Sequence, residues 1–218
     1  MVHTGIDVFD GLLSNFTPQT ERQIEEWEAR QRVNELRQFH ENSGMDKAFY
    51  LAKVSDLEGE TSRRVEAFIK HYEEGMGLFL VVLGGVGTGK THIACSVMNE
   101  LQSGTYLDMP ELHLKLNTAD RYNATETREQ LMHRLSKCKL LVLDEVGRMP
   151  NRKEQEQETL FYLMNKRYAN GRATIIVSNM SLKEFNEFAG QAIIDRMKGR
   201  SIFLELTGES RRGKNGNR

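Results

Sequence analysis

The sequence predicts an α/β fold in which helices cover both faces of a parallel sheet, preceded by a short N-terminal helical segment. Continuous apolar runs alternate with longer segments of helical periodicity, a pattern typical of parallel strands that are buried on both faces. A glycine-rich stretch lies between one such run and the helix after it. Hydrophobic residues make up 39% and charged residues 28% of the 218 residues, which is typical of a globular domain.

The first predicted element is one helix over residues 20–41, a range without glycine or proline. Its apolar stripe consists of Ala29, Val33, Leu36 and Phe39, whose spacing places them on one face. Ile24 and Trp27 point roughly the other way. Either both faces are buried within a small helical subdomain, or Ile24 and Trp27 are left for a partner protein. We assign residues 1–48 to an N-terminal, partner-binding helical segment.

The rest of the chain is predicted to alternate between helices and strands. The predicted strands are residues 78–83, 105–107, 139–143, 173–177 and 201–205. The predicted helices are residues 63–74, 90–101, a helix from 110, 125–137, 153–168, and shorter ones near 182–188 and 190–198. Pro110 is favoured in the first turn of a helix, and Ser181 with Glu184 forms a capping box. We assign residues 49–207 to one α/β domain and 208–218 to a flexible basic tail.

The glycine-rich stretch fits G-x-x-x-x-G-K-[ST], the phosphate-binding loop of P-loop NTPases. Its members are Gly84, Gly85, Val86, Gly87, Thr88, Gly89, Lys90 and Thr91. In such a loop, backbone N–H groups surround the phosphates and the next helix adds its positive end. Lys90 can reach the β- and γ-phosphates, and the Thr91 hydroxyl can ligate Mg²⁺. We therefore predict ATP and Mg²⁺ as cofactors, with His92 also in the cofactor site.

Two later strands end in polar residues that would complete this chemistry. The run at 140–143 leads into Asp144, which would hold the Mg²⁺ shell, and Glu145, which would polarise the attacking water. The run at 173–177 leads to Asn179, which would lie beside Asp144 and orient the water or the γ-phosphate. The alternative for Asn179 is an ordinary turn residue at a strand end.

In order and spacing, four segments resemble the DnaC/IstB-like AAA+ ATPases, which include helicase loaders of bacteria and phages. These segments are residues 84–91, 140–145, 178–179 and 194–197. The resemblance spans residues 50–212 and implies an AAA+ ATPase domain of the ASCE type at 49–207. By that likeness, Arg196 matches the arginine finger that reaches the γ-phosphate held by a neighbouring subunit, and Arg211 matches the second sensor arginine. The alternatives are a solvent-facing helical arginine for Arg196 and a tail charge for Arg211, with Arg212 an equal candidate.

The resemblance also implies three partners: a replicative DnaB-type helicase, single-stranded DNA and further copies of the chain. The DNA-binding candidates are Lys115, Arg121, Tyr122 and Arg128, together with Arg134. Cations there suit neutralisation of a DNA backbone and Tyr122 suits base stacking, although a charge-rich helix is ordinarily a solvated face. The formal net charge of −1 excludes a global attraction to nucleic acid, so any DNA binding has to be local.

The sequence leaves three other functions open: an IstB-like ATPase that assists a transposase, a small-molecule kinase, and an ATP-gated binding protein with negligible turnover. The extra strand at 105–107, and Glu145 directly after Asp144, argue against a kinase. No apolar run approaches the length of a membrane span, residues 1–10 lack the layout of a signal peptide, and Cys95 and Cys138 lie in apolar-periodic segments. We therefore expect a cytoplasmic protein with no membrane partner.

Overall fold

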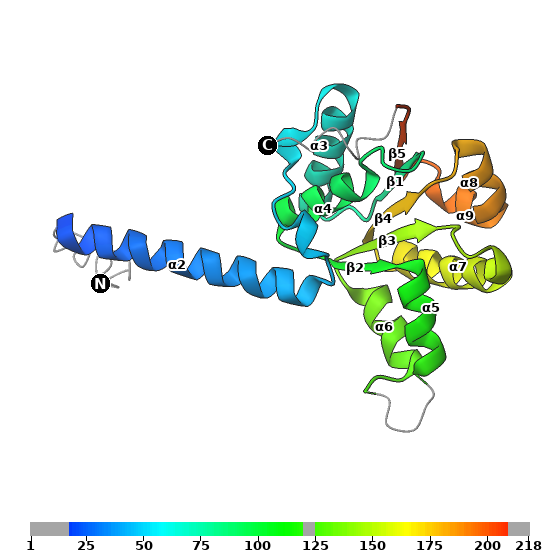
Figure 1. Cartoon of the computed structure of the whole chain (residues 1–218), viewed down its shortest axis with the longest axis horizontal. Helices are drawn as coiled ribbons and strands as arrows, with labels where there is room; N and C mark the ends of the chain where they lie inside the picture. Colours follow the sequence, from blue (N-terminus) through cyan, green and yellow to red (C-terminus); the bar gives the residue numbers. More distant parts are fainter. Residues whose placement is uncertain (1–17, 120–124, 209–218) are drawn as a thin grey trace, which may run out of the picture. The chain divides into compact units, whose positions relative to one another are not determined.

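The structure is a computed structural model that describes residues 18–119 and 125–208. The chain divides into two compact units, residues 1–41 and 42–218. Helix α2 spans Pro18–Ser43 (Figure 1). It contains the described residues of the first unit, and its last two residues belong to the second. It confirms the helix that was predicted at 20–41. The predicted domain limits at residues 48 and 207 remain predictions.

Helix α2 exposes large apolar side chains on both of its faces. Trp27 is 61% exposed and Ile24 39% exposed, whereas Val33, on the face of the predicted stripe, is 57% exposed. Leu36 and Phe39 are half-buried. Neither face of the described helix is therefore completely buried, and its described residues do not show the burial of both faces that a small helical subdomain would give.

The second unit is built on a five-stranded sheet in which every neighbouring pair is parallel (Figure 1). Its strands are β1 (Phe79–Gly84), β2 (Thr105–Asp108), β3 (Leu140–Val146), β4 (Ala173–Ser178) and β5 (Ser201–Leu206). All five predicted strands are confirmed. Their order is β2-β3-β4-β1-β5, so β2 lies at an edge and β4 separates β1 from β3. The carboxyl ends of these parallel strands meet at one edge of the sheet.

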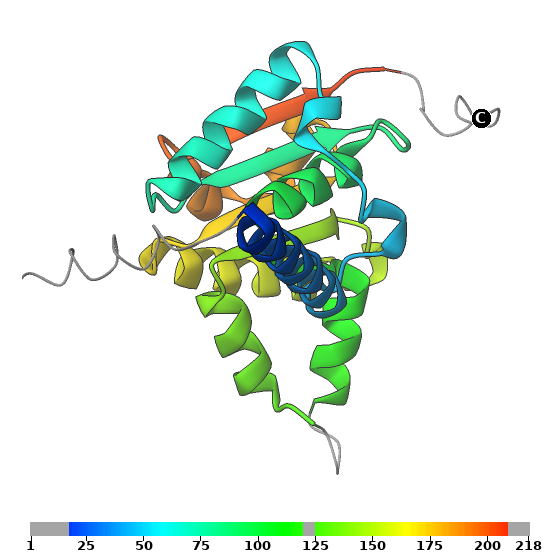
Figure 2. The ribbon, with the colours of Figure 1, turned by 90° about the vertical axis from the view of Figure 1, so that its left-hand side faces the viewer.

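Helices cover both faces of this sheet, as the alternating pattern predicted. They are α3 (Gly59–Glu73), α4 (Lys90–Leu101), α5 (Met109–Thr118), α6 (Arg128–Lys137), α7 (Lys153–Ala169), α8 (Leu182–Ala189) and α9 (Gln191–Met197). Short 3₁₀ turns lie at Lys47–Phe49, Val54–Asp56 and Pro150–Arg152. Helices α3 and α4 pack on one face, and α5 to α9 share one apolar core on the other. Figures 1 and 2 show α5 and α6 extending from the β2 edge.

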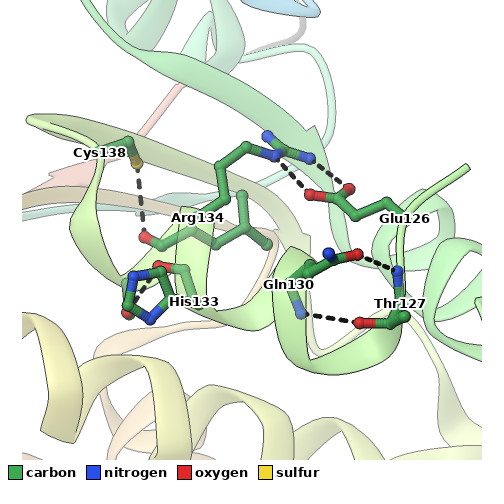
Figure 3. A network of polar contacts seen from close by, with 8 residues as sticks. Glu126, Thr127, Gln130, His133, Arg134 and Cys138 are labelled. Atoms are coloured by element: carbon green, nitrogen blue, oxygen red, sulfur yellow. Dashed lines mark hydrogen bonds and ion pairs between the residues drawn. The ribbon is translucent and has the colours of Figure 1, made fainter.

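Helix ends follow the local capping chemistry. Helix α6 begins at Arg128 rather than at residue 125, because Thr127 and Gln130 form a reciprocal capping box that fixes its first turn (Figure 3). The predicted capping box of Ser181 and Glu184 is confirmed at the start of α8. Among the described residues, no helix combines the length and the apolar character that crossing a membrane requires.

A buried arginine joins three elements on the α5–α9 face. Arg167 on α7 is 0% exposed. Its guanidinium donates to the Thr174 hydroxyl at 2.8 Å, to the Cys138 carbonyl at 3.0 Å, and to the carbonyls of Leu135 and Ala173. Burial lowers the pKa of Arg167, because no described carboxylate forms an ion pair with it and only neutral acceptors surround it. The arginine thereby ties the end of α6 and the start of β4 to α7.

We predict that Arg167→Met lowers the free energy of unfolding by about 3 kcal/mol, as measured by urea denaturation. The change removes a desolvated charge, but it leaves several buried carbonyls without a donor, and this second effect is the larger. Lys166→Met is the control, since Lys166 is the exposed neighbour on the same helix and its loss costs less than about 0.5 kcal/mol. Equal stability of the two variants would show that the carbonyls find other donors.

Candidate functional site

The glycine-rich loop leads from β1 into α4 through backbone conformations that glycine favours. Gly84, Gly87 and Gly89 have φ values of 138°, 80° and 97°, a region that L side chains rarely adopt. A Cβ at Gly84 would lie 2.4 Å from the Leu206 carbonyl oxygen of β5. Because Gly89 at the N-cap has no side chain, the first-turn N–H groups of α4 have no side-chain cap. They remain available to an anion.

Two side chains of the loop fold back on its own backbone. The Lys90 ammonium donates to the Gly85 carbonyl oxygen at 2.7 Å, and the Thr88 hydroxyl donates to the same oxygen at 2.9 Å. Lys90 and Thr88 are each only 7% exposed, whereas Val86 at the tip is 63% exposed. The lysine is therefore held over the hollow of the loop, where phosphates bind in proteins that carry this pattern.

A buried carboxylate lies beside the start of α4. Asp144 on β3 is 3% exposed. Its Oδ2 accepts hydrogen bonds from the Thr91 hydroxyl at 2.7 Å and from the Tyr106 hydroxyl at 2.8 Å, and its Oδ1 accepts from the Glu145 N–H at 2.6 Å. The two residues predicted to share a metal, Thr91 and Asp144, are thus in direct contact. One carboxylate and one hydroxyl suit Mg²⁺, which keeps several waters and takes its remaining oxygens from phosphates.

Sequence reasoning missed Tyr106 in this site. Burial, together with the negative charge of Asp144, raises the pKa of Tyr106, so the phenol stays protonated and remains a donor. An aromatic residue in a short edge strand is an ordinary core signal, and nothing in its spacing separates it from one. Its role emerges only from the pairing of β2 with β3.

Glu145 lies in a β-bulge. The register of β3 on β4 shifts between Leu143 and Val146, and Glu145 has a φ of 56°, uncommon for a residue with a side chain. Bulges of this kind re-aim side chains and concentrate near active sites. The Glu145 carboxylate is ion-paired with Arg148, and its side chain is 32% exposed. The two adjacent acids thus have different partners: Asp144 contacts Thr91 and Tyr106, whereas Glu145 contacts Arg148.

The segment after Glu145 is anchored by a second buried acid, which sequence reasoning also missed. Glu156 on α7 is 0% exposed and accepts from the N–H groups of Gly147 at 2.6 Å and Met149 at 3.3 Å. Burial raises the pKa of this carboxyl, whereas the two N–H donors act in the opposite direction. A glutamate in a charged, helix-forming stretch carries no sequence signal of burial.

Asn179 follows β4 directly and is exposed. Since β4 lies between β1 and β3, this residue reaches the same sheet edge as the phosphate loop and Asp144. The preceding Ser178 donates to the Val146 carbonyl at 2.6 Å and accepts from the Met180 N–H at 3.2 Å. These bonds tie the end of β4 to the bulged end of β3.

Three other predicted site residues lie away from this cluster or outside the described residues. Nε2 of His92 lies 3.9 Å from the Asp56 carboxylate, so its side chain turns toward the segment before α3. Arg196 on α9 contacts Ala192 and Phe161, neither of which belongs to the phosphate loop. Arg211 lies outside the described residues.

The DNA-binding candidates differ in how their charges are used. Arg121 and Tyr122 lie outside the described residues. Lys115 forms an ion pair with Glu111 at 3.0 Å. Arg134, the further candidate, binds both carboxylate oxygens of Glu126, at 2.8 and 2.9 Å (Figure 3). Arg128 is exposed at the first residue of α6, and in the described parts of the chain no acid pairs with it.

Comparison with known proteins assigns the family. The family model described as IstB-like ATP binding protein matches residues 28–218. The chain belongs to this family. It is 25% identical over 166 residues to the replicative helicase loader DnaC of Escherichia coli K12, covering 73% of this chain and 66% of that protein. It is 27% identical over 162 residues to the DnaC of Buchnera aphidicola from Schizaphis graminum (72% and 65%). It is also 30% identical over 152 residues to the insertion sequence IS21 putative ATP-binding protein of Pseudomonas aeruginosa (67% and 55%).

The chain thus spans less than two thirds of the length of each of these relatives. Among solved structures, it is similar to the DnaC helicase loader, with a TM-score of 0.58 at 20% identity, covering 74% of this chain and all of that one. It is also similar to AMPPCP-bound DnaA from Aquifex aeolicus, with a TM-score of 0.59 at 21% identity, covering 72% and 50%. At these identities the likeness shows the fold alone, and it confirms the predicted AAA+ P-loop fold.

Proposed function

We propose that this family member is an ATP-dependent loader that places a replicative DnaB-type helicase on single-stranded DNA. The observation that carries the ATP-dependent part of the proposal is the contact of Thr91 with Asp144 beside the phosphate loop, at the sheet edge that Asn179 also reaches. Hydrolysis of ATP by water needs a loop that binds the phosphates, an acid that holds the metal and a polar residue that orients the water. The phosphate loop, Asp144 and Asn179 would supply these at the carboxyl edge of the sheet.

The proposed chemistry uses the residues in separate roles. The loop N–H groups and Lys90 bind the phosphates, while Thr91 and Asp144 hold Mg²⁺, which neutralises charge that develops on the transferred phosphoryl group. Glu145 accepts the proton of the attacking water, and Asn179 orients that water. His92 and Arg211 are proposed to complete the nucleotide site, Arg211 as the second sensor.

The proposed partners rest on the relatives' names and on individual residues of this chain. Two relatives are replicative helicase loaders, and a DnaA neighbour at 22% identity and a TM-score of 0.55 was solved bound to single-stranded DNA. We assign the helicase to the exposed Trp27 face of α2. We assign DNA to Arg128, with Lys115, Arg121 and Tyr122, and a neighbouring copy of the chain to Arg196. Loading of a replicative helicase would take place in the cytoplasm.

The second candidate is an ATPase that assists a transposase. The observation in its favour is the 30% identity to the IS21 putative ATP-binding protein, which is higher than the 25% and 27% to the two loaders. The two candidates share the ATP site and differ in the protein that α2 would bind. Binding assays with purified replicative helicase and purified transposase separate them directly.

We predict that Lys90→Ala weakens ATP binding on the order of 10- to 100-fold in a calorimetric titration, because a charge-assisted contact with the phosphates is lost.

Glu145→Gln keeps ATP binding and lowers turnover by about 10²- to 10⁴-fold, since an amide cannot accept the proton of water. The matched controls are Lys70→Ala and Glu154→Gln, both at exposed positions. Normal ATP affinity of Lys90→Ala would remove the lysine from the site, and normal turnover of Glu145→Gln would move the base elsewhere.

We predict that Trp27→Ala weakens capture of the replicative helicase by roughly 30-fold, because exposed aromatic anchors carry much of the energy of an interface. ATP binding stays normal in the variant. Val33→Ala is the control, since Val33 is similarly exposed on the opposite face of α2. Equal losses in both variants would exclude a Trp27-specific contact, and capture of transposase instead of helicase would select the second candidate.

We predict that Arg196→Ala binds ATP normally but loses turnover by on the order of 10³-fold, because a finger supplied by a neighbour stabilises charge on the transferred phosphoryl group. In a mixing assay, Arg196→Ala subunits supply an intact Lys90 and Glu145, and Lys90→Ala subunits supply an intact Arg196. Hydrolysis should reappear when these two inactive variants are combined. Full activity of Arg196→Ala alone, at every protein concentration, would contradict an arginine that acts between subunits.

A further inference from the structure

The Arg196 guanidinium forms no ion pair with any described acid, although, after hydrogen bonds from Lys198 and Gln191, its charge contributes to lowering the pKa of the adjacent Asp195. Helix α9 is anchored in the core by Ile193 and Met197, each 1% exposed, and Arg196 lies between them in sequence, on another face. The adjacent Asp195 carboxylate accepts from Gln191 at 2.8 Å and from Lys198 at 2.6 Å. In the described residues, no carboxylate lies within ion-pair distance of the Arg196 guanidinium.

Two contacts nevertheless hold this guanidinium in place. Its Nη1 donates to the Ala192 carbonyl of its own helix at 2.6 Å. Its Cζ lies 5.7 Å from the centroid of the Phe161 ring, which α7 presents at the surface with 42% of the residue exposed. A cation over an aromatic face is attracted to it by about 0.5–1 kcal/mol at exposed sites. Because α7 packs against α9, the helix that carries the ring is held beside the arginine.

We propose that Phe161 is a positioning residue, which holds Arg196 ready for the γ-phosphate of a neighbouring subunit. This inference rests on the proposed function of Arg196. An acidic partner would orient the arginine equally well, but it would neutralise the charge and occupy the N–H donors that a phosphate needs. A ring face restrains the guanidinium without taking up the N–H donors at its edge, one of which the Ala192 carbonyl accepts. Restraint also reduces the rotamer entropy that the arginine loses when it binds phosphate.

The chain contains a matched control for this contact on the same helix. Tyr162, the next residue of α7, is also 42% exposed, and Lys166 Nζ lies 5.7 Å from its ring centroid. The two aromatic residues therefore have the same exposure and the same kind of cationic partner. They differ in which cation they hold, and Lys166 has no proposed catalytic role.

The test measures steady-state ATP hydrolysis of the full chain at saturating protein concentration. Phe161→Leu should lower kcat about two- to five-fold, which is the rate equivalent of the lost cation–π contact, with KM for ATP unchanged. Phe161→Tyr keeps an aromatic face and should retain wild-type turnover, and Tyr162→Leu should have no effect. Thermal unfolding of each variant checks that the exposed substitution leaves the fold intact.

Subunit mixing shows through which subunit Phe161 acts. In the mixture of Lys90→Ala and Arg196→Ala subunits, Phe161→Leu should lower the recovered hydrolysis only when it is placed in the Lys90→Ala subunit, which supplies the arginine. An equal loss from either subunit would show a packing role and overturn the proposal. Unchanged turnover of Phe161→Leu, with Arg196→Ala inactive, would overturn it and leave the finger standing. Full activity of Arg196→Ala alone would overturn both.

Discussion

The buried carboxylate of Asp144 is the constraint on which the candidate site depends. A carboxylate that is 3% exposed is costly to bury unless hydrogen-bond donors surround it. Here the donors come from α4 (Thr91), from β2 (Tyr106) and from the next peptide N–H. Satisfying one acid therefore fixes the first turn of α4, and with it the phosphate loop, against β3 and the edge strand β2.

The backbone that follows Asp144, at the bulged end of β3, is also held by hydrogen bonds to buried side chains. Glu156 binds the two N–H groups that follow the bulge, and Ser178 binds the carbonyl of Val146 within it. Glu145 thus occupies a left-handed conformation between two anchored stretches of backbone. A residue in a strained backbone conformation persists where the surrounding structure holds it in place. Here the hydrogen bonds of Glu156 and Ser178 to the backbone after Glu145 provide that support. Preorganisation of Glu145 is the consequence, because its backbone cannot relax without breaking buried hydrogen bonds.

Much of the fold was predictable because its strands are fully buried and the phosphate loop has a fixed spacing. The runs that became β1, β3 and β4 are almost entirely apolar, so their existence and their parallel pairing were indicated by a strong signal. The proximity of Lys90, Thr91 and Asp144 was predictable because these residues lie at the carboxyl ends of parallel strands or at the start of the next helix. Tyr106, Glu156 and Arg167 could not be found in this way. Tyr106 lies in a short strand where an aromatic residue is ordinary, and Glu156 and Arg167 lie in a charged helix. Because acids and arginines are rarely buried, the sequence predicts that such residues are exposed.

The spatial order of the strands was a further limit on prediction. Sequence spacing indicated an extra strand at 105–107, yet that strand, β2, lies at the sheet edge. The strand between β1 and β3 is β4, which comes much later in the chain. That order brings Asn179 to the same edge as the phosphate loop.

The cations show the same dependence on long-range structure: Lys115 and Arg134 are paired with nearby acids, whereas Arg196 rests on Phe161 and a carbonyl. In a chain with a net charge of −1, local attraction to phosphate depends on which cations remain unneutralised. Composition cannot show this, because it follows from side-chain packing.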